Sequence, residues 1–208
     1  MRLWLFDILA CPICKHYPLK LYIFSYQVEE DKFKKYLKDY NENTFNYENQ
    51  DILKISQDTE DKILIKDEIV IEKKPIIKYL EDILTSVGEL KNIEDLSPYE
   101  KSKKCLSIAR EKIFEQLIEF SKKSDLNQIE SIIPELIFLN KLKIDAEIES
   151  GILFCNECNR WFPIIDTIPR MLPDEYRDKA KELDFLKSKK DILNKEFFNL
   201  DLKPFNLQ

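Results

Sequence analysis

Four of the five cysteines are arranged in two C-x-x-C pairs, a spacing suited to metal or redox chemistry. Cys11 and Cys14 form the sequence C-P-I-C, and Cys155 and Cys158 form C-N-E-C. Two such pairs supply four thiolates, the tetrahedral ligand set that zinc prefers, with Zn–S distances of about 2.3 Å. A single pair would fit a thioredoxin-like redox motif equally well. Two pairs favour one structural zinc ion held by all four cysteines.

The two pairs lie far apart in the sequence, because about 140 residues separate Cys14 from Cys155. In zinc ribbons the usual gap is only about 15–20 residues. If one ion takes all four thiolates, the metal must tie the two ends of the chain together, and everything between them is an insertion. Sparse charge at both ends and dense charge in the middle fit this division.

We therefore expect an α+β protein with three parts. Residues 1–26 and 151–173 would form a discontinuous zinc-binding module, whose short antiparallel sheet is built from both chain ends. Residues 27–150 would form an inserted, mainly α-helical domain. Residues 174–208 would form a C-terminal helical extension.

Within the zinc module, three apolar stretches predict strands, at residues 19–26, 151–155 and 160–165. Residues 3–9 are apolar apart from one aspartate and predict a short helix or turn before the first cysteine pair. Pro163 lacks an N–H donor, which places the last strand at a sheet edge. Trp161 and Phe162 would point to opposite faces of that strand.

The insert and the extension show helical periodicity. Apolar residues at helical spacing predict three helices, over residues 76–88, 97–121 and 129–139. Gly88 is well placed as a C-terminal cap of the first helix, and Pro134 would interrupt or kink the last one. Residues 62–71 alternate less cleanly and fit either a hairpin or an irregular insert. Asp174 is a good N-cap for the helical extension.

Four other residues could take part in the chemistry of the metal site. Cys105 borders the apolar stripe of a predicted helix and is expected to be a small buried hydrophobe rather than a ligand. His16 could be a fifth ligand, but four thiolates complete the shell, so we expect it to be a polar neighbour of the cysteines. Lys15 and Arg160 could offset the charge of about −2 on a zinc–tetrathiolate centre, or belong to the ordinary solvated surface.

Composition excludes several kinds of active site. The only glycines are Gly88 and Gly151, so neither a Gly-x-Gly nucleotide loop nor a phosphate-binding P-loop can be built. One histidine leaves little room for Ser-His-Asp or Cys-His catalysis. We therefore expect a chain that does not catalyse a reaction alone.

Charge and hydropathy bear on partners and location. The formal net charge of −6 argues against a broad nucleic-acid-binding face, which needs basic residues. No apolar run approaches the roughly 20 residues of a membrane span, and the first nine residues are too short and wrongly flanked for a signal peptide. We expect a cytoplasmic protein with no membrane partner.

Two stretches together resemble the zinc-binding methyltransferase activator family. They are LFDILACPICK at residues 5–15 and GILFCNECNRWFPIIDTIPRML at residues 151–172, and they occur in the family's order. Members of that family are small partner subunits shared by several tRNA, rRNA and release-factor methyltransferases in archaea and eukaryotes. The resemblance covers roughly 40 to 50 residues at the two ends, whereas the middle resembles the family only in its position.

The resemblance implies a non-catalytic subunit. In the family, the zinc module docks on a Rossmann-like, S-adenosylmethionine-dependent methyltransferase by backbone strand pairing and apolar contacts, forming a heterodimer. Carried over to this sequence, it assigns one structural zinc ion to the four paired cysteines. It also implies a partner surface that includes Ile164, Ile165, Ile168, Pro169, Met171 and Leu172. Packing of these apolar residues against the chain's own helices is the alternative, and nucleic acid would be met only indirectly through the partner.

Two other function classes stay open at this point. A zinc-ribbon nucleic-acid-binding protein of the translation or transcription apparatus would use the same cysteines, but it needs a basic face. A thiol–disulfide enzyme would use one C-x-x-C pair and leave the other unexplained. One tightly held zinc ion per chain would exclude the redox enzyme, and the identity of a co-purifying partner would separate the other two classes.

Overall fold

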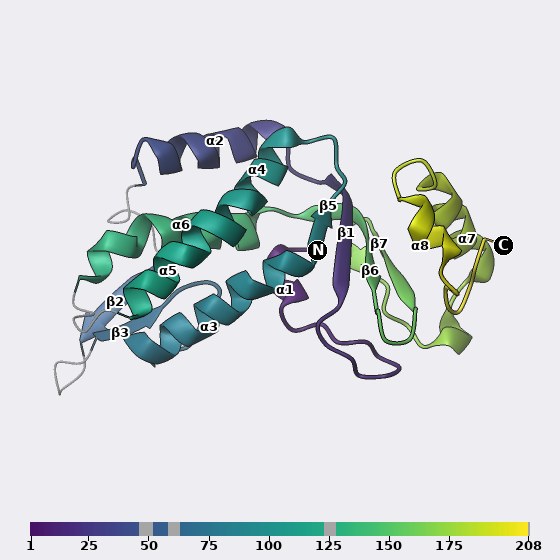
Figure 1. Cartoon of the computed structure of the whole chain (residues 1–208), viewed down its shortest axis with the longest axis horizontal. Helices are drawn as coiled ribbons and strands as arrows, with labels where there is room; N and C mark the ends of the chain where they lie inside the picture. The colour runs from purple at the N-terminus through teal and green to yellow at the C-terminus, as the bar shows by residue number, and fades with distance from the viewer. Residues whose placement is uncertain (46–51, 58–62, 123–127, 208) are drawn as a thin grey trace. The chain divides into compact units, whose positions relative to one another are not determined.

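The computed structural model describes residues 1–45, 52–57, 63–122 and 128–207 and has the expected mixed α+β class (Figure 1). The chain divides into two compact units. The first unit comprises Met1–Gln27, Asn92–Pro98 and Glu147–Gln208. The second comprises Val28–Lys91 and Tyr99–Ala146. The boundaries depart from the predicted ones, because residues 92–98 lie within the predicted insert but belong to the first unit, and the extension belongs to that unit as well.

The first unit contains a five-stranded sheet in the order β5-β1-β6-β7-β8. Its strands are β1 (Lys20–Tyr26), β5 (Ile93–Asp95), β6 (Ile148–Phe154), β7 (Trp161–Ile165) and β8 (Ile168–Pro169). The strands β1, β6, β7 and β8 pair antiparallel, as expected for a sheet built from both chain ends. The added strand β5 is parallel to β1 and comes from the middle of the chain.

The prediction that β7 lies at the sheet edge is wrong. A two-residue turn, in which both Asp166 and Thr167 have positive φ, folds the chain back so that β8 pairs with β7. Positive φ at both central residues is typical of a tight hairpin turn. Pro163 is tolerated because its backbone faces β8, where its carbonyl accepts a 2.9 Å hydrogen bond from the Arg170 N–H. The edge strand on this side is therefore β8.

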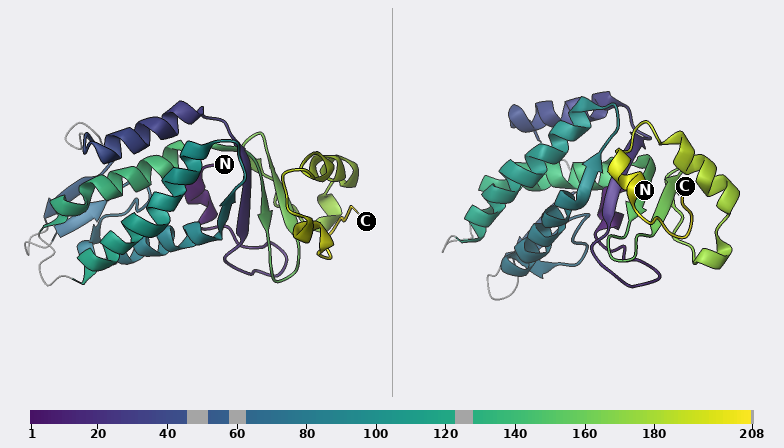
Figure 2. Two further views of the ribbon diagram at one scale, coloured as in Figure 1. Left: turned by 45° about the horizontal axis from the view of Figure 1, so that its top comes forward. Right: turned by 45° about the vertical axis from the view of Figure 1, so that its right-hand side comes forward.

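The C-terminal extension packs on one face of this sheet (Figure 2). It contains a short 3-10 turn (Asp174–Tyr176), α7 (Lys179–Ser188) and α8 (Lys195–Asn199). The expectation that Asp174 caps the helix is wrong: the Asp178 side chain accepts the hydrogen bond from the Lys181 N–H that caps α7. Asp174 instead binds Arg160. The predicted helix before the first cysteine pair is present as α1 (Leu3–Phe6).

The second unit is mainly helical, as the periodicity predicts. Its helices are α2 (Glu30–Asn41), α3 (Ile76–Glu89), α4 (Glu100–Ile108), α5 (Phe114–Ser121) and α6 (Ile133–Asn140). A π-helical segment at Ala109–Ile113 joins α4 to α5. The predicted long helix is therefore one helical run that widens at its centre.

Of two local expectations in these helices, one is wrong and one is confirmed. Gly88 is not a cap, because α3 continues through it into a 3-10 turn at Leu90–Asn92 whose first residue is buried, and Gly88 does not have a positive φ. The expected interruption near Pro134 is confirmed: the run breaks after the 3-10 turn Ile129–Ile132, and Pro134 lies in the first turn of α6, where the missing N–H removes no helical hydrogen bond. The preceding 3-10 turn, Ile129–Ile132, is a separate element.

The second unit also has a small three-stranded antiparallel sheet in the order β2-β3-β4. Its strands are β2 (Lys54–Gln57), β3 (Ile63–Lys66) and β4 (Lys74–Pro75). The segment for which a hairpin or an irregular insert was predicted, residues 62–71, therefore supplies the central strand β3. Its first residue, Lys62, lies outside the described residues. In the described part of the chain, no helix combines the length and apolar character needed to span a membrane.

The two glycines give a matched test of the packing around β6. A Cβ atom at Gly151 would lie 2.6 Å from the Tyr22 carbonyl oxygen and 3.2 Å from Cδ1 of Ile164, whereas one at Gly88 would meet nothing within 4 Å. We predict that Gly151→Ala destabilises the protein by about 1–3 kcal/mol, because backbone must move to admit the methyl group. Gly88→Ala should stabilise it by roughly 0.5–1 kcal/mol, because alanine favours a helix interior.

Chemical unfolding of both zinc-loaded variants, followed by circular dichroism, checks this pair. Equal stabilities for Gly151→Ala and the parent chain would contradict the close approach of β1 and β6.

Candidate metal centre

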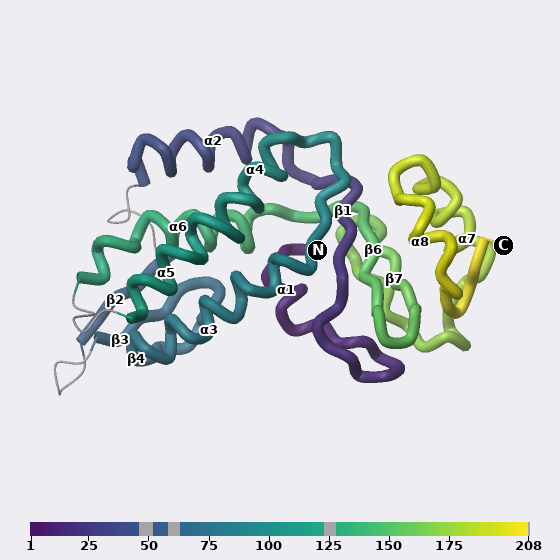
Figure 3. The backbone as a smooth tube through the Cα atoms, viewed as in Figure 1, coloured from purple at the N-terminus to yellow at the C-terminus, as the bar shows by residue number. Residues whose placement is uncertain are grey.

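The four paired cysteines come together at one end of the first unit's sheet. Cys11 and Cys14 lie in the loop between α1 and β1, and Cys155 and Cys158 lie in the turn between β6 and β7; Figure 3 shows these two segments side by side. All four sulfur atoms lie within 4.8 Å of one another. The arrangement can hold one metal ion.

The sulfur spacing fits a tetrahedral thiolate site. The Sγ atoms of Cys11 and Cys158 are 3.7 Å apart, and those of Cys14 and Cys155 are 3.5 Å apart. Ligands at about 2.3 Å from a tetrahedral zinc ion lie roughly 3.8 Å from one another. All four cysteines are free thiols, so no disulfide competes for the sulfurs. The donor set and its spacing are consistent with zinc.

The two cysteine pairs adopt matching backbone turns. The N–H of Cys11 donates to the carbonyl of His16 at 3.0 Å, and the N–H of Cys155 donates to the carbonyl of Arg160 at 2.8 Å. In each pair the residue after the second cysteine has a positive φ: 63° at Lys15 and 55° at Asn159. Non-glycine residues rarely adopt this conformation. The turns were not predicted from the sequence, and only the asparagine gives a hint of them.

Without a metal, the thiols differ in acidity. Burial raises the pKa of Cys11 and, more strongly, that of Cys155. Burial would also raise the pKa of Cys158, but hydrogen bonds from the backbone and side chain of Arg160 and from the thiols of Cys155 and Cys14 together outweigh it and lower that pKa to about 7. A cation bound by the four sulfurs would allow all of them to be thiolates together, and its binding would release protons.

Arg160 links the cysteine cluster to the start of the C-terminal extension. Its guanidinium group donates to the Asp174 carboxylate from Nε at 3.1 Å and from Nη2 at 2.9 Å. Its hydrogen bonds to Asp174, and also one to Cys158, raise the pKa of Arg160. Of the two roles that the sequence left open for Arg160, the hydrogen bond to Cys158 favours charge compensation at the centre over a place in the ordinary solvated surface.

The other candidate residues lie outside the four-cysteine group. His16 contributes its backbone carbonyl to the first turn, and the Nζ atom of Lys15 donates to the Pro12 carbonyl at 2.8 Å. Cys105 belongs to the second unit, where it is fully buried and its sulfur faces the Phe33 carbonyl at 3.7 Å. Burial raises the pKa of Cys105 to about 12, so this thiol is an inert core residue, as expected.

The six apolar residues implied to form a partner surface have different surroundings. Ile164 is 0% exposed and packs inside the first unit, so the expectation that it contacts a partner is wrong: its side chain lies on the face of β7 that packs toward Gly151. Ile168 and Leu172 are 57% and 45% exposed. The remaining three are half-buried: Ile165, Pro169 and Met171. Trp161 and Phe162, on opposite faces, are both fully buried.

Comparison with known proteins identifies the family. The family model described as Trm112p-like protein matches residues 2–166, which include all four clustered cysteines and most of the chain. The chain therefore belongs to the Trm112p-like family. No curated protein sequence and no solved structure matched it.

Replacing one clustered cysteine should remove the metal and destabilise the first unit. We predict that Cys155→Ser lowers the bound zinc from one ion per chain to less than about 0.1, because a tetrathiolate site needs all four ligands and its binding energy contributes to folding. The helical signal of the second unit should be partly retained. Elemental analysis and circular dichroism of the purified chain measure both effects.

Cys105→Ala is the matched control, since it removes a buried thiol that lies outside the cluster, and it should keep full zinc content. A Cys155→Ser chain with one zinc ion would contradict the four-cysteine centre.

Proposed function

We propose that this chain is a zinc-binding, non-catalytic subunit that binds, stabilises and activates S-adenosylmethionine-dependent methyltransferases acting on tRNA, rRNA or translation release factor. One observation carries the proposal: the cysteine cluster joins the two chain ends within a stretch that matches the Trm112p-like family from residue 2 to residue 166. In this proposal the working form is a heterodimer in the cytoplasm, and nucleic acid is met only through the partner.

The proposed metal is one structural zinc ion, held by Cys11, Cys14, Cys155 and Cys158. Four protein ligands complete a tetrahedral shell and leave no position for water or substrate, as is usual for structural rather than catalytic sites. The ion would act by fixing the loop before β1 against the turn before β7, and thereby the register of the sheet.

The proposed docking surface is the β8 edge of the sheet and the segment that follows it. β8 is the last strand on its side of the sheet in the described chain, so its outer backbone groups can accept another strand. The apolar side chains there are exposed or half-buried: Ile165, Ile168, Pro169, Met171 and Leu172. Edge pairing combined with apolar pockets is a known mode of partner recognition. Ile164 is excluded from this surface.

Affinity capture tests the proposed function. The full-length chain, purified with its interactors from the native cells and analysed by mass spectrometry, should bring down one or more Rossmann-like methyltransferases in stoichiometric amount. A capture dominated by RNA or DNA without a methyltransferase would favour the zinc-ribbon nucleic-acid-binding alternative, against which the net charge of −6 already counts.

A charged residue in the docking segment should weaken methyltransferase binding. We predict that Met171→Asp raises the dissociation constant at least tenfold, because burying such a side chain contributes about 1.5–3 kcal/mol, only partly offset by the cost of association. Titration calorimetry with a captured methyltransferase measures this. Ile71→Asp, which alters an exposed residue of the second unit, is the control and should bind normally. Unchanged affinity in a Met171→Asp chain with normal zinc content would place the interface elsewhere.

The isolated chain should not bind the methyl donor. We predict no heat of binding for S-adenosylmethionine up to about millimolar concentration and no methyl transfer, because a chain with two glycines cannot form the glycine-rich loop that such cofactor sites use. When a captured methyltransferase is added, both the heat of S-adenosylmethionine binding and methyl transfer should be observed. Micromolar binding to the chain alone would show that it has a cofactor site of its own.

A further inference from the structure

The C-terminal extension covers an apolar face of the first unit's sheet. The sheet residues on this face are Tyr22, Phe24, Ile152, Phe154 and Trp161, and the extension residues packed on them are Leu186, Leu193, Phe197 and Leu202; all nine are buried. The Phe197 ring makes edge contacts with Tyr22 and Phe154, at centroid distances of 5.4 and 5.3 Å. Without the extension, this face would expose five large apolar side chains.

The extension also pairs with the backbone of β7. The Lys203 N–H donates to the Asn159 carbonyl at 2.9 Å, and the Trp161 N–H donates to the Lys203 carbonyl at 3.3 Å. Together they form a parallel bridge between Arg160 and Lys203. The start of β7 therefore has its outer backbone groups occupied by the extension, while the end of β7 is paired with β8.

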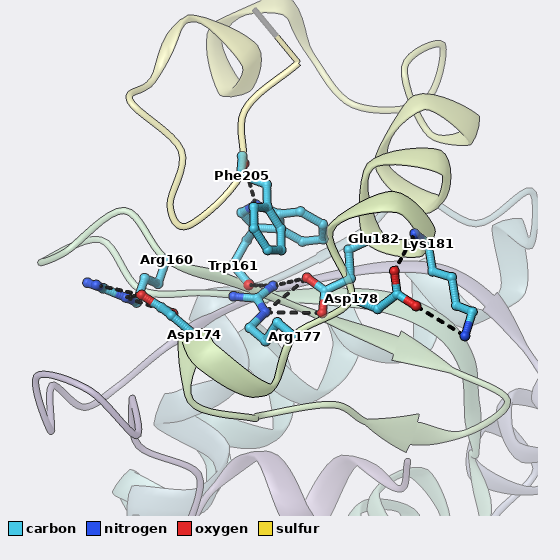
Figure 4. A network of polar contacts seen from close by, with 8 residues as sticks. All are labelled: Arg160, Trp161, Asp174, Arg177, Asp178, Lys181, Glu182 and Phe205. Carbon is cyan, nitrogen blue, oxygen red and sulfur yellow. Dashed lines mark hydrogen bonds and ion pairs between the residues drawn. The ribbon is translucent and has the colours of Figure 1, made fainter.

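A buried polar network holds the extension in place (Figure 4). The Arg177 guanidinium forms an ion pair with Glu182 and donates to the Trp161 carbonyl at 2.8 Å. The same group lies 5.2 Å from the Trp161 ring and 5.6 Å from the Phe205 ring. The Trp161 indole N–H donates to the Phe205 carbonyl at 3.0 Å. Because both ends of the extension converge on Trp161, they are fixed at a single position of the sheet.

We propose that residues 174–207 act as an intramolecular binding partner of this sheet. They occupy a face and a strand edge that would otherwise form a protein-binding surface, since exposed apolar faces and open strand edges recruit other chains. Two consequences follow. The zinc-loaded chain stays monodisperse without a methyltransferase, and among the described residues on this side of the sheet only β8 remains open to a partner strand. The second consequence alone rests on the proposed function.

The full-length, zinc-loaded chain carrying Phe197→Asp tests the proposal. We expect the variant to keep its zinc, bind the dye ANS, associate in light scattering, and exchange the Trp161 amide hydrogen at least tenfold faster by NMR. Ile192→Asp is the matched control, because it introduces the same charge at an exposed position of the extension. It should behave like the parent chain.

A milder variant keeps the test decisive if Phe197→Asp loses its zinc. Phe197→Ala should retain the metal and still speed the Trp161 amide exchange by a smaller factor, whereas amides of α3 in the second unit should be unchanged. A Phe197→Ala or Phe197→Asp chain with parental exchange at Trp161 and no association would overturn the proposal. No methyltransferase enters these measurements, so their failure is distinct from failure of the proposed function.

Discussion

The constraint on which the first unit depends is that four sulfur atoms from opposite ends of the chain must meet. Cys11 and Cys158 are 147 positions apart and their sulfurs are 3.7 Å apart. Closing a loop of this length costs roughly 4–5 kcal/mol of chain entropy by the logarithmic loop-length relation. A structural zinc site supplies about 10–16 kcal/mol. An ion of this kind therefore offsets the entropic cost of closing the loop about two- to four-fold, and the strands that carry the cysteines can pair with little further loss of entropy.

The sheet then follows from local features that the sequence displays. Short apolar runs predicted β1, β6 and β7, and the helical stripes predicted α3, the run from α4 to α5, and α6. The helices were predictable because each one buries an apolar stripe at helical spacing, and the strands because each contains a short, nearly continuous apolar run that is buried on both faces. The cysteine cluster was predictable because ligand type and spacing are visible without knowledge of the fold. The role of Arg160 was harder to predict. From the sequence it could either offset the charge of the metal centre or belong to the ordinary solvated surface.

The features that were missed depend on contacts between distant parts of the chain. β5 is three residues long, Ile93–Asp95, and two of them are acidic, so only its pairing with β1 makes it a strand. Pro163 suggested an edge, but a tight turn at Asp166 and Thr167, which lacks a glycine, brings β8 alongside it. Asp174 has the residue type of a helix cap, yet the nearby Arg160 binds its carboxylate instead. Ile164 is apolar like the exposed Ile168 and Leu172, but it lies within β7, where residues on both faces of the strand are buried.

The placement of β5 in the sheet bears on how the protein emerges from the ribosome. The first cysteine pair and β1 leave the exit tunnel early, but their partners β6 and the second pair follow only after about 120 further residues. At roughly 5–20 residues per second of synthesis, β1 waits on the order of 6–25 seconds before its antiparallel partner exists. β5, made about midway, is the one strand of this sheet that can pair with β1 in the meantime. A parallel strand from the middle of the chain thus gives the nascent β1 a pairing partner before β6 is made, and this pairing is kept in the folded sheet.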